Sequence, residues 1–334
     1  MKLSFHFLIA ALSFSNVAMC QDTSQYLPRT LRAVLVETTD GTSLSGTVLS
    51  ENAETIVLET KSLGTVTIQK SHIKFIKELD DTSFVNGSFR FENPSASYYV
   101  LGPSSFSLKK GEVNYQNYYI VGQSVTVGIT NQFSISAGTE LLTPITDRKP
   151  PRTYFVAART NYRIAENFGI GLGILYVQNN KTGIVQSKSQ YGIAYGQATF
   201  GKKNHNATLG IGWSYRNTYS IYRYTGESYT DKGVMDKPIV SFSAMTRVSK
   251  RLLLTSETWL FPEVDSYRDR NGLPTRSVYS YNGVTAYGVR FIGEKMSIDL
   301  GFLNNKSIAE SIWIGAPYVC FAVKFGGEKQ TVKK

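Results

Sequence analysis

The chain has few of the residues that metal sites and disulfide frameworks use. Only two cysteines, Cys20 and Cys320, and three histidines, His6, His72 and His205, occur in 334 residues. A disulfide scaffold and a zinc cluster of His and Cys ligands are therefore excluded. The sequence also lacks a G-x-S-x-G elbow, a Walker loop and a zinc motif. We predict no enzyme activity, no metal site and no cofactor.

Proline and charge are also scarce, with 10 prolines and 18% charged residues. Glycine (28), tyrosine (21) and phenylalanine (18) are abundant. This composition favours strands over helices. After residue 20 no apolar run approaches the roughly 18 residues that a membrane helix requires, so any membrane embedding must use strands.

The amino terminus, residues 1–20, is typical of an export signal. Lys2 precedes an apolar stretch, and small or polar residues follow it. Cleavage after Cys20 would place Ala18 three positions before the cut, whereas lipidation of Cys20 would need a small residue in place of Met19. We favour cleavage after Cys20 without lipidation, and a lipoprotein modified at Cys20 is the alternative.

Residues 31–79 contain five short alternating runs with turn signals between them, such as Asp40-Gly41. One helical turn is expected at residues 70–72. Five strands in so short a stretch predict a small barrel of the SH3 or Sm-like kind, followed by a linker at residues 80–95. RNA binding is the disfavoured reading, because the stretch is acidic and has no aromatic platform. We expect no nucleic-acid partner and instead a structural role or a periplasmic protein partner.

Beyond residue 95, roughly ten-residue alternating segments are joined alternately by short and long connections. The short joints are 130–132, 165–167, 201–205, 249–251 and 293–295, and the long ones are 143–152, 178–189, 217–237, 262–278 and 304–316. Outer-membrane barrels have short periplasmic turns and long external loops. The pattern therefore predicts an antiparallel transmembrane β-barrel over residues 96–325, with a polar tail at 326–334.

The joints delimit eleven strands, and closing the barrel with both ends in the periplasm needs a twelfth, which we assign to residues 96–104. The other predicted strands are 112–129, 133–142, 153–164, 168–177, 190–200, 206–216, 238–248, 252–261, 279–292, 296–303 and 317–325. The fold class is thus all-β: a small Sm/SH3-like barrel followed by a barrel of about 12 strands.

The alternation within these strands supports lipid contact. From Phe168 to Ile174, and again from Met296 to Phe302, every second residue is large and apolar and its neighbour is small or polar. A soluble sandwich would alternate too, but the export signal and the loop asymmetry favour a membrane barrel. Tyrosines near the strand ends predict an interfacial girdle: Tyr98, Tyr99, Tyr118, Tyr119, Tyr154, Tyr176, Tyr215, Tyr219, Tyr279 and Tyr318.

Residues 93–135 carry a recurrent block: Gly102-Pro103-Ser104, Leu108 to Glu112, Tyr115-Gln116-Asn117 and Gly128-Ile129-Thr130. This block resembles one in a family of outer-membrane barrel proteins of the Bacteroidota, some with an Sm-like domain in front. The resemblance implies the fold and an outer-membrane location, with residues 31–79 in the periplasm. It implies no activity.

Six cationic and three acidic residues lie at strand positions whose side chains are predicted to point into the lumen. They are Glu140, Arg159, Arg163, Arg216, Arg247, Glu257, Arg290, Asp299 and Lys324. In a hydrated lumen these cations would attract anions, and in a narrow one the charges would pair and fill the space. We favour a passive pore for small solutes, with a preference for anions. The alternative is a non-conducting structural barrel that docks an envelope partner. Outer-membrane lipid and the barrel-assembly machinery are expected partners in either case.

Overall fold

The computed structural model describes residues 32–79, 84–85, 87–119, 121–182, 185–268 and 274–326. The chain divides into two compact units, one ending at residue 79 and one beginning at residue 80. The predicted export signal lies outside the described residues, and so does the predicted tail after Gly326.

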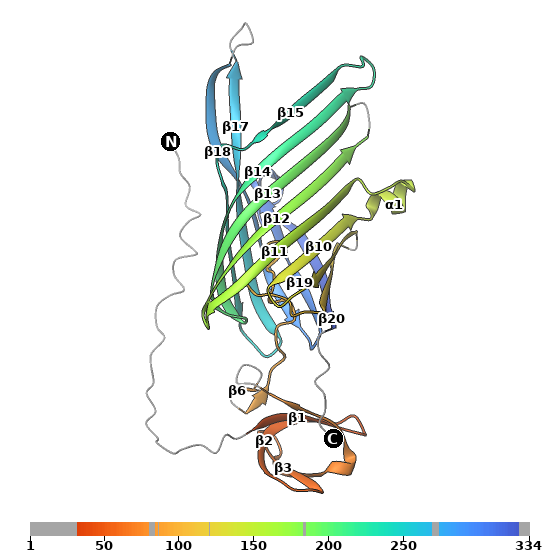
Figure 1. Cartoon of the computed structure of the whole chain (residues 1–334), viewed down its shortest axis with the longest axis vertical. Helices are drawn as coiled ribbons and strands as arrows, with labels where there is room; N and C mark the ends of the chain where they lie inside the picture. Colours follow the sequence, from red (N-terminus) through yellow and green to blue (C-terminus); the bar gives the residue numbers. More distant parts are fainter. Residues whose placement is uncertain are drawn as a thin grey trace. The chain divides into compact units, whose positions relative to one another are not determined.

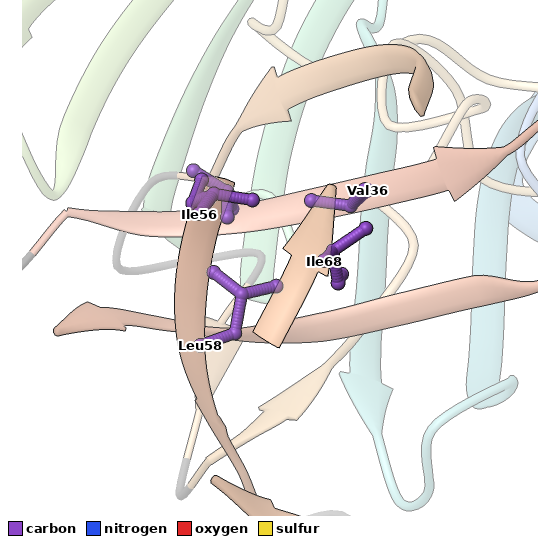
Figure 2. Close-up of a cluster of buried hydrophobic side chains, with 5 residues drawn as sticks. Val36, Ile56, Leu58 and Ile68 are labelled. Carbon is purple, nitrogen blue, oxygen red and sulfur yellow. The ribbon is translucent and has the colours of Figure 1, made fainter. Parts of the chain in front are cut away.

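The first unit is an antiparallel five-stranded sheet whose strands follow the order β4-β3-β2-β1-β5. The strands are β1 Ala33–Thr38, β2 Ser43–Glu51, β3 Thr55–Thr60, β4 Gly64–Gln69 and β5 Ile73–Glu78, with one 3-10 turn, η1 Lys70–His72. The five predicted strands and the turn before the last are all confirmed. Because apolar residues alternate along each strand, one face of the sheet closes on a core of Val34, Val36, Ile56, Leu58 and Ile68 (Figure 2). The Sm-like assignment stays a prediction.

The second unit is a closed antiparallel barrel of twelve strands (Figure 1). It closes because β20 pairs with β8 and β13 pairs with β14. The barrel strands are β8 Glu112–Tyr118, β9 Gly122–Gly128, β10 Phe133–Glu140, β11 Thr153–Ala165, β12 Phe168–Lys181, β13 Val185–Lys202, β14 His205–Tyr222, β16 Ile239–Arg247, β17 Leu252–Arg268, β18 Pro274–Ile292, β19 Met296–Asn305 and β20 Ala316–Gly326. The predicted number of strands is confirmed.

One of the twelve predicted strands is nevertheless wrong. Residues 96–104 form no barrel strand, and their only ladder contact is a bridge between Tyr98 and Pro103. The missing strand comes from the predicted strand 112–129, which is two strands, β8 and β9, joined by a tight turn that includes Tyr119 at φ 51°. A proline has no N–H to donate to a central strand, so Gly102-Pro103 could not continue a ladder.

The long connections are also shorter than predicted. Strands β12, β13, β14, β17 and β18 extend far into the stretches 178–189, 217–237 and 262–278, and β15 Ser228–Val234 folds back onto the end of β14 (Figure 1). The other two stretches contain short helices, α1 Leu142–Asp147 and α2 Lys306–Ser311. These extensions are polar, and a polar hairpin satisfies its backbone groups without an apolar face. We call the opposite end of the barrel, where the predicted short joints lie, the short-turn end.

A two-stranded hairpin, β6 Phe84–Val85 and β7 Ser88–Phe89, precedes the barrel within the predicted linker.

Candidate functional site

The candidate site is a segment of irregular chain, Asn93 to Leu108, that lies inside the barrel and is called the inner segment below. All residues from 93 to 100 are buried. The chain reverses at residues 100–102, where the N–H of Tyr99 donates to the carbonyl of Gly102 at 2.9 Å. Its hydrogen-bond partners come from β11, β13, β14, β16, β17, β18 and β19. The inner segment therefore spans the lumen.

Glu257 of β17 holds the reversal. Its carboxylate accepts the backbone N–H groups of Val100 at 2.8 Å, Leu101 at 2.8 Å and Gly102 at 2.6 Å. The indole N–H of Trp259 donates to the same carboxylate. Glu257 is 1% exposed, so a charged side chain there needs every one of these donors. Three consecutive N–H groups on one carboxylate form an anion-binding nest, here made by the chain itself.

Arg290 of β18 forms the second anchor. Its guanidinium is fully buried and makes two 2.7 Å hydrogen bonds to Asp299 of β19. It also donates to the carbonyls of Ser95 at 2.8 Å and Tyr98 at 3.1 Å, and to the carbonyl of Tyr99. The planar fork thus donates to three backbone carbonyls of the inner segment.

Apolar and hydroxyl contacts complete the packing. Tyr99 packs with Met245, Leu253 and Ile292, and Val100 packs with Ala286, Tyr318 and Cys320. The Tyr99 hydroxyl also lies 2.6 Å from both Asn206 Oδ1 and Thr208 Oγ1. Both of these partners belong to β14, so the ring is held by the wall at its hydroxyl as well as along its apolar body.

Three further predicted lumen cations contact the inner segment or the chain just before it. Arg159 donates to the carbonyl of Ser97 at 2.9 Å, and the Arg163 guanidinium lies 4.6 Å from the centre of the Phe106 ring. Arg247 donates to the carbonyl of Phe91 at 2.6 Å. Six of the nine predicted charges therefore surround this chain: Arg159, Arg163, Arg247, Glu257, Arg290 and Asp299.

The remaining three predicted charges lie elsewhere. Glu140 accepts from the backbone N–H groups of Thr143 and Arg152 and so closes the α1 loop. Arg216 bonds Asp231 of β15 at 2.5 Å, and Lys324 lies 3.3 Å from Glu112. Glu140 and Arg216 thus stabilise the long connections.

Sequence reasoning missed the inner segment itself and the residues that receive it, above all Gly102 and Trp259. A Cβ atom at Gly102 would lie 2.6 Å from Glu257 Oε1 and 2.7 Å from Trp259 Cζ2, so only glycine fits. The available signals were the Gly102-Pro103 pair and the loss of alternation after it.

The outer face of the barrel is apolar and exposed. Leu172 and Ile174 of β12 are 63% and 62% exposed, and Leu209 of β14 is 53% exposed. Of the predicted girdle, Tyr98, Tyr99 and Tyr318 are instead buried inside the barrel. Exposed members of that set are Tyr119, Tyr154, Tyr176, Tyr215 and Tyr219.

No helix among the described residues has the length and apolar character to cross a membrane. Within the described ranges, no group of three or more His, Cys, Asp or Glu could hold a metal ion. The side chain of His205 pairs through Nδ1 with Thr246 Oγ1 at 2.8 Å.

No family model matches the chain, and no curated protein matches it. Among solved structures, a KdgM porin in complex with disordered oligogalacturonate is 10% identical, with a TM-score of 0.38, over 65% of this chain and 99% of that chain. A NanC porin is 10% identical, with a TM-score of 0.35, over 66% and 100%. The translocator domain of the autotransporter NalP from Neisseria meningitidis is 10% identical, with a TM-score of 0.30, over 66% and 87%. Because these scores are low, the function proposed for this chain rests on its own residues and not on the neighbours.

Proposed function

We propose that this protein is an outer-membrane barrel whose passage for small solutes is controlled by the inner segment. The support for membrane insertion is the closed sheet together with its exposed apolar outer face. Exposed leucines and isoleucines on several adjacent strands would cost free energy in water, whereas in hydrocarbon they are favourable. The first unit would then lie in the periplasm, on the side of the short turns.

The observation that carries the proposal is the set of three N–H groups on Glu257. Among the described contacts, this carboxylate is satisfied only by the inner segment and Trp259. If the segment left, water would enter the lumen and hydrate Glu257, while Arg290 would keep Asp299. When the inner segment leaves, Glu257 therefore exchanges its hydrogen bonds to the segment for hydrogen bonds to water, and no buried charge is left without a partner. A state with the inner segment displaced is thus physically accessible.

In this proposal, the barrel prefers anions while the inner segment is displaced. With the segment in place, Arg159, Arg247 and Arg290 donate to its carbonyls or to those just before it. Once it leaves, Arg159 and Arg247 face the lumen without these partners and attract anions.

The second candidate is a silent barrel in which the inner segment never moves and the first unit docks a periplasmic partner. The two ionic anchors and the two apolar clusters favour it, because all of them hold the segment. One experiment separates the two candidates.

Ser95 and Ser297 are both buried, and their hydroxyl oxygens lie 2.7 Å apart, so the S95C/S297C variant should form a disulfide between the inner segment and β19. In planar bilayers we expect wild type to show discrete conductance steps, the oxidised variant to show none, and reduction to restore them. The single variants S95C and S297C are the controls. Unchanged steps in the oxidised variant would refute control by the segment, and silence of every form, including Glu257→Gln, would favour the structural role.

A further inference from the structure

The inner segment reaches farthest from the short-turn end at its reversal, residues 100–102, which are called the tip below. On either side of the tip, Ser95 bonds the second residue of β19 and Ser105 bonds a residue three positions from the end of β13, both close to short turns. The partner of the tip is Glu257, which lies five residues beyond the first residue of β17. A solute that enters from the long connections therefore meets the tip before the rest of the segment.

Leu101 shows that the tip adjoins free space in the lumen. It is 54% exposed, although its N–H is fixed by the buried Glu257 at 2.8 Å. Its neighbours Val100 and Gly102 are both buried. The tip is thus accessible at one residue, which stands in the middle of the three that donate to Glu257.

The donors of the tip match both oxygens of a carboxylate. Val100 and Leu101 each donate a backbone N–H to Oε2 of Glu257 at 2.8 Å, and Gly102 donates to Oε1 at 2.6 Å. The indole N–H of Trp259 donates to Oε1 as well. Consecutive backbone N–H groups that converge in this way form an anion site. Because every group that faces Glu257 in these contacts is a donor, the site suits a carboxylate better than an amide, which would bring an NH₂ group against them.

The surroundings of the inner segment also favour an anion. The six charges around it, described above, are four arginines and two acids, which leaves a net charge of +2. Asp299 neutralises Arg290, whereas none of the described ion pairs includes Arg159. A net positive lumen raises the local concentration of anionic solutes.

We propose that the three N–H groups of the tip are a binding site for the carboxylate of a small solute, and that Glu257 occupies this site until such a solute takes its place. The inference rests on the proposed function, in which the inner segment leaves Glu257, and it names small carboxylates as the substrate class. A ligand that binds only the displaced tip shifts the population toward displacement. Carboxylates therefore open the barrel more effectively than chloride, which is a single atom and cannot present two oxygens to the donors.

Glu257 is the competitor of the solute. Because β17 holds it beside the tip, its effective concentration there is high, and a free carboxylate competes only at high concentration. Removal of this side chain exposes the site to direct measurement. Glu257→Ala deletes one methylene group and one carboxylate beyond Cβ, and acetate supplies one methyl group and one carboxylate.

Hydrogen exchange in the full-length refolded protein tests the site itself. We expect the amides of residues 100–102 to exchange about tenfold faster or more in Glu257→Ala than in wild type, because they lose their acceptor. Sodium acetate should slow them saturably, by about fivefold or more, as a ligand of the folded state. Acetamide and sodium chloride at the same concentration should not. The matched control is Glu263→Ala, where these amides should exchange at wild-type rates with and without acetate.

Single-channel recording of the wild-type chain tests the coupling to opening, and it does not depend on refolding of the variant. Replacing chloride by acetate at constant ionic strength should raise the fraction of time that the barrel conducts by about threefold or more. An equal fraction in the two salts would overturn the role of carboxylates in opening.

The two measurements also separate this inference from the proposed function. If acetate does not slow exchange in a Glu257→Ala variant whose heat-modifiable migration shows a folded barrel, the carboxylate site is refuted. A wild-type barrel that is silent in both salts would refute the proposed passage of solutes, and the exchange measurement would still decide whether the tip binds a carboxylate.

Discussion

Arg290 and Asp299 are register partners on β18 and β19, and their side chains join through two 2.7 Å hydrogen bonds inside the barrel. Facing residues of a hairpin point to the same side of the sheet, so the register brings the two charges together. The pair then presents the remaining guanidinium donors to the backbone of the inner segment. One ion pair thereby links the barrel wall to the chain inside it.

We predict that Arg290→Met destabilises the folded barrel by about 3–5 kcal/mol, because it leaves the Asp299 carboxylate buried without a cation. The R290M/D299L double variant should recover much of that loss. Urea unfolding of the four members of the cycle measures the coupling between the two residues. Additive losses would show that the pair is not coupled.

We predict that Glu257→Gln raises the fraction of time the barrel conducts by about tenfold or more. The amide oxygen accepts more weakly than a carboxylate. The new NH₂ group would face either the backbone N–H groups of Val100 and Leu101 or that of Gly102, depending on which carboxylate oxygen it replaces. About 1.4 kcal/mol of lost stabilisation corresponds to a factor of ten. Single-channel recording is the measurement. The matched control is Glu263→Gln on the same strand, where the carboxylate accepts from Asn282 at 2.9 Å and makes no described contact with the inner segment.

We predict that Gly102→Ala displaces the tip of the inner segment without unfolding the barrel. The added methyl group would overlap Glu257 Oε1 and Trp259 Cζ2, at 2.6 and 2.7 Å. Hydrogen exchange at the amides of residues 99–102 should quicken by at least tenfold, because they lose their acceptors. Gly233→Ala, with no atom within 4 Å of the new Cβ, should leave exchange at residues 99–102 unchanged. Slow exchange in both variants would contradict the described fit.

In the first unit, we predict that Leu58→Ala costs about 2–5 kcal/mol of local stability, because Leu58 is fully buried in the core. Hydrogen exchange of the β1–β5 amides in the intact chain measures the loss. Leu63→Ala, in an exposed turn, should change stability by less than about 0.5 kcal/mol. An equal effect of the two substitutions would argue against the described core.

Most of the barrel strands and the inward placement of Glu257, Arg290 and Asp299 can be predicted from local patterns. Strict alternation assigns every residue of a strand to one face, so the face of each charge follows from its position along the strand. Short turns likewise mark strand ends, because they are built from a few polar and glycine residues. The small five-stranded unit follows from the same rules.

The long hairpins cannot be predicted in this way, because polar residues lie on both faces of their strands. Residues 178–189 and 217–237 look like loops when an apolar face is the criterion, yet much of each is strand. Backbone pairing across a hairpin needs no apolar side chain, and the neighbouring strand supplies the partner.

The place of the inner segment, by contrast, depends on contacts that no local pattern contains. Tyr98, Tyr99 and Val100 are as suitable for a lipid-facing strand as for a buried core. Their place inside the barrel is set by residues about 155 to 200 positions away, Glu257 and Arg290 among them, whose buried charges need partners. Local sequence determines the wall, because strand periodicity is a property of neighbouring residues. The contents of the lumen depend on closure of the whole sheet, which brings distant charges around one short chain.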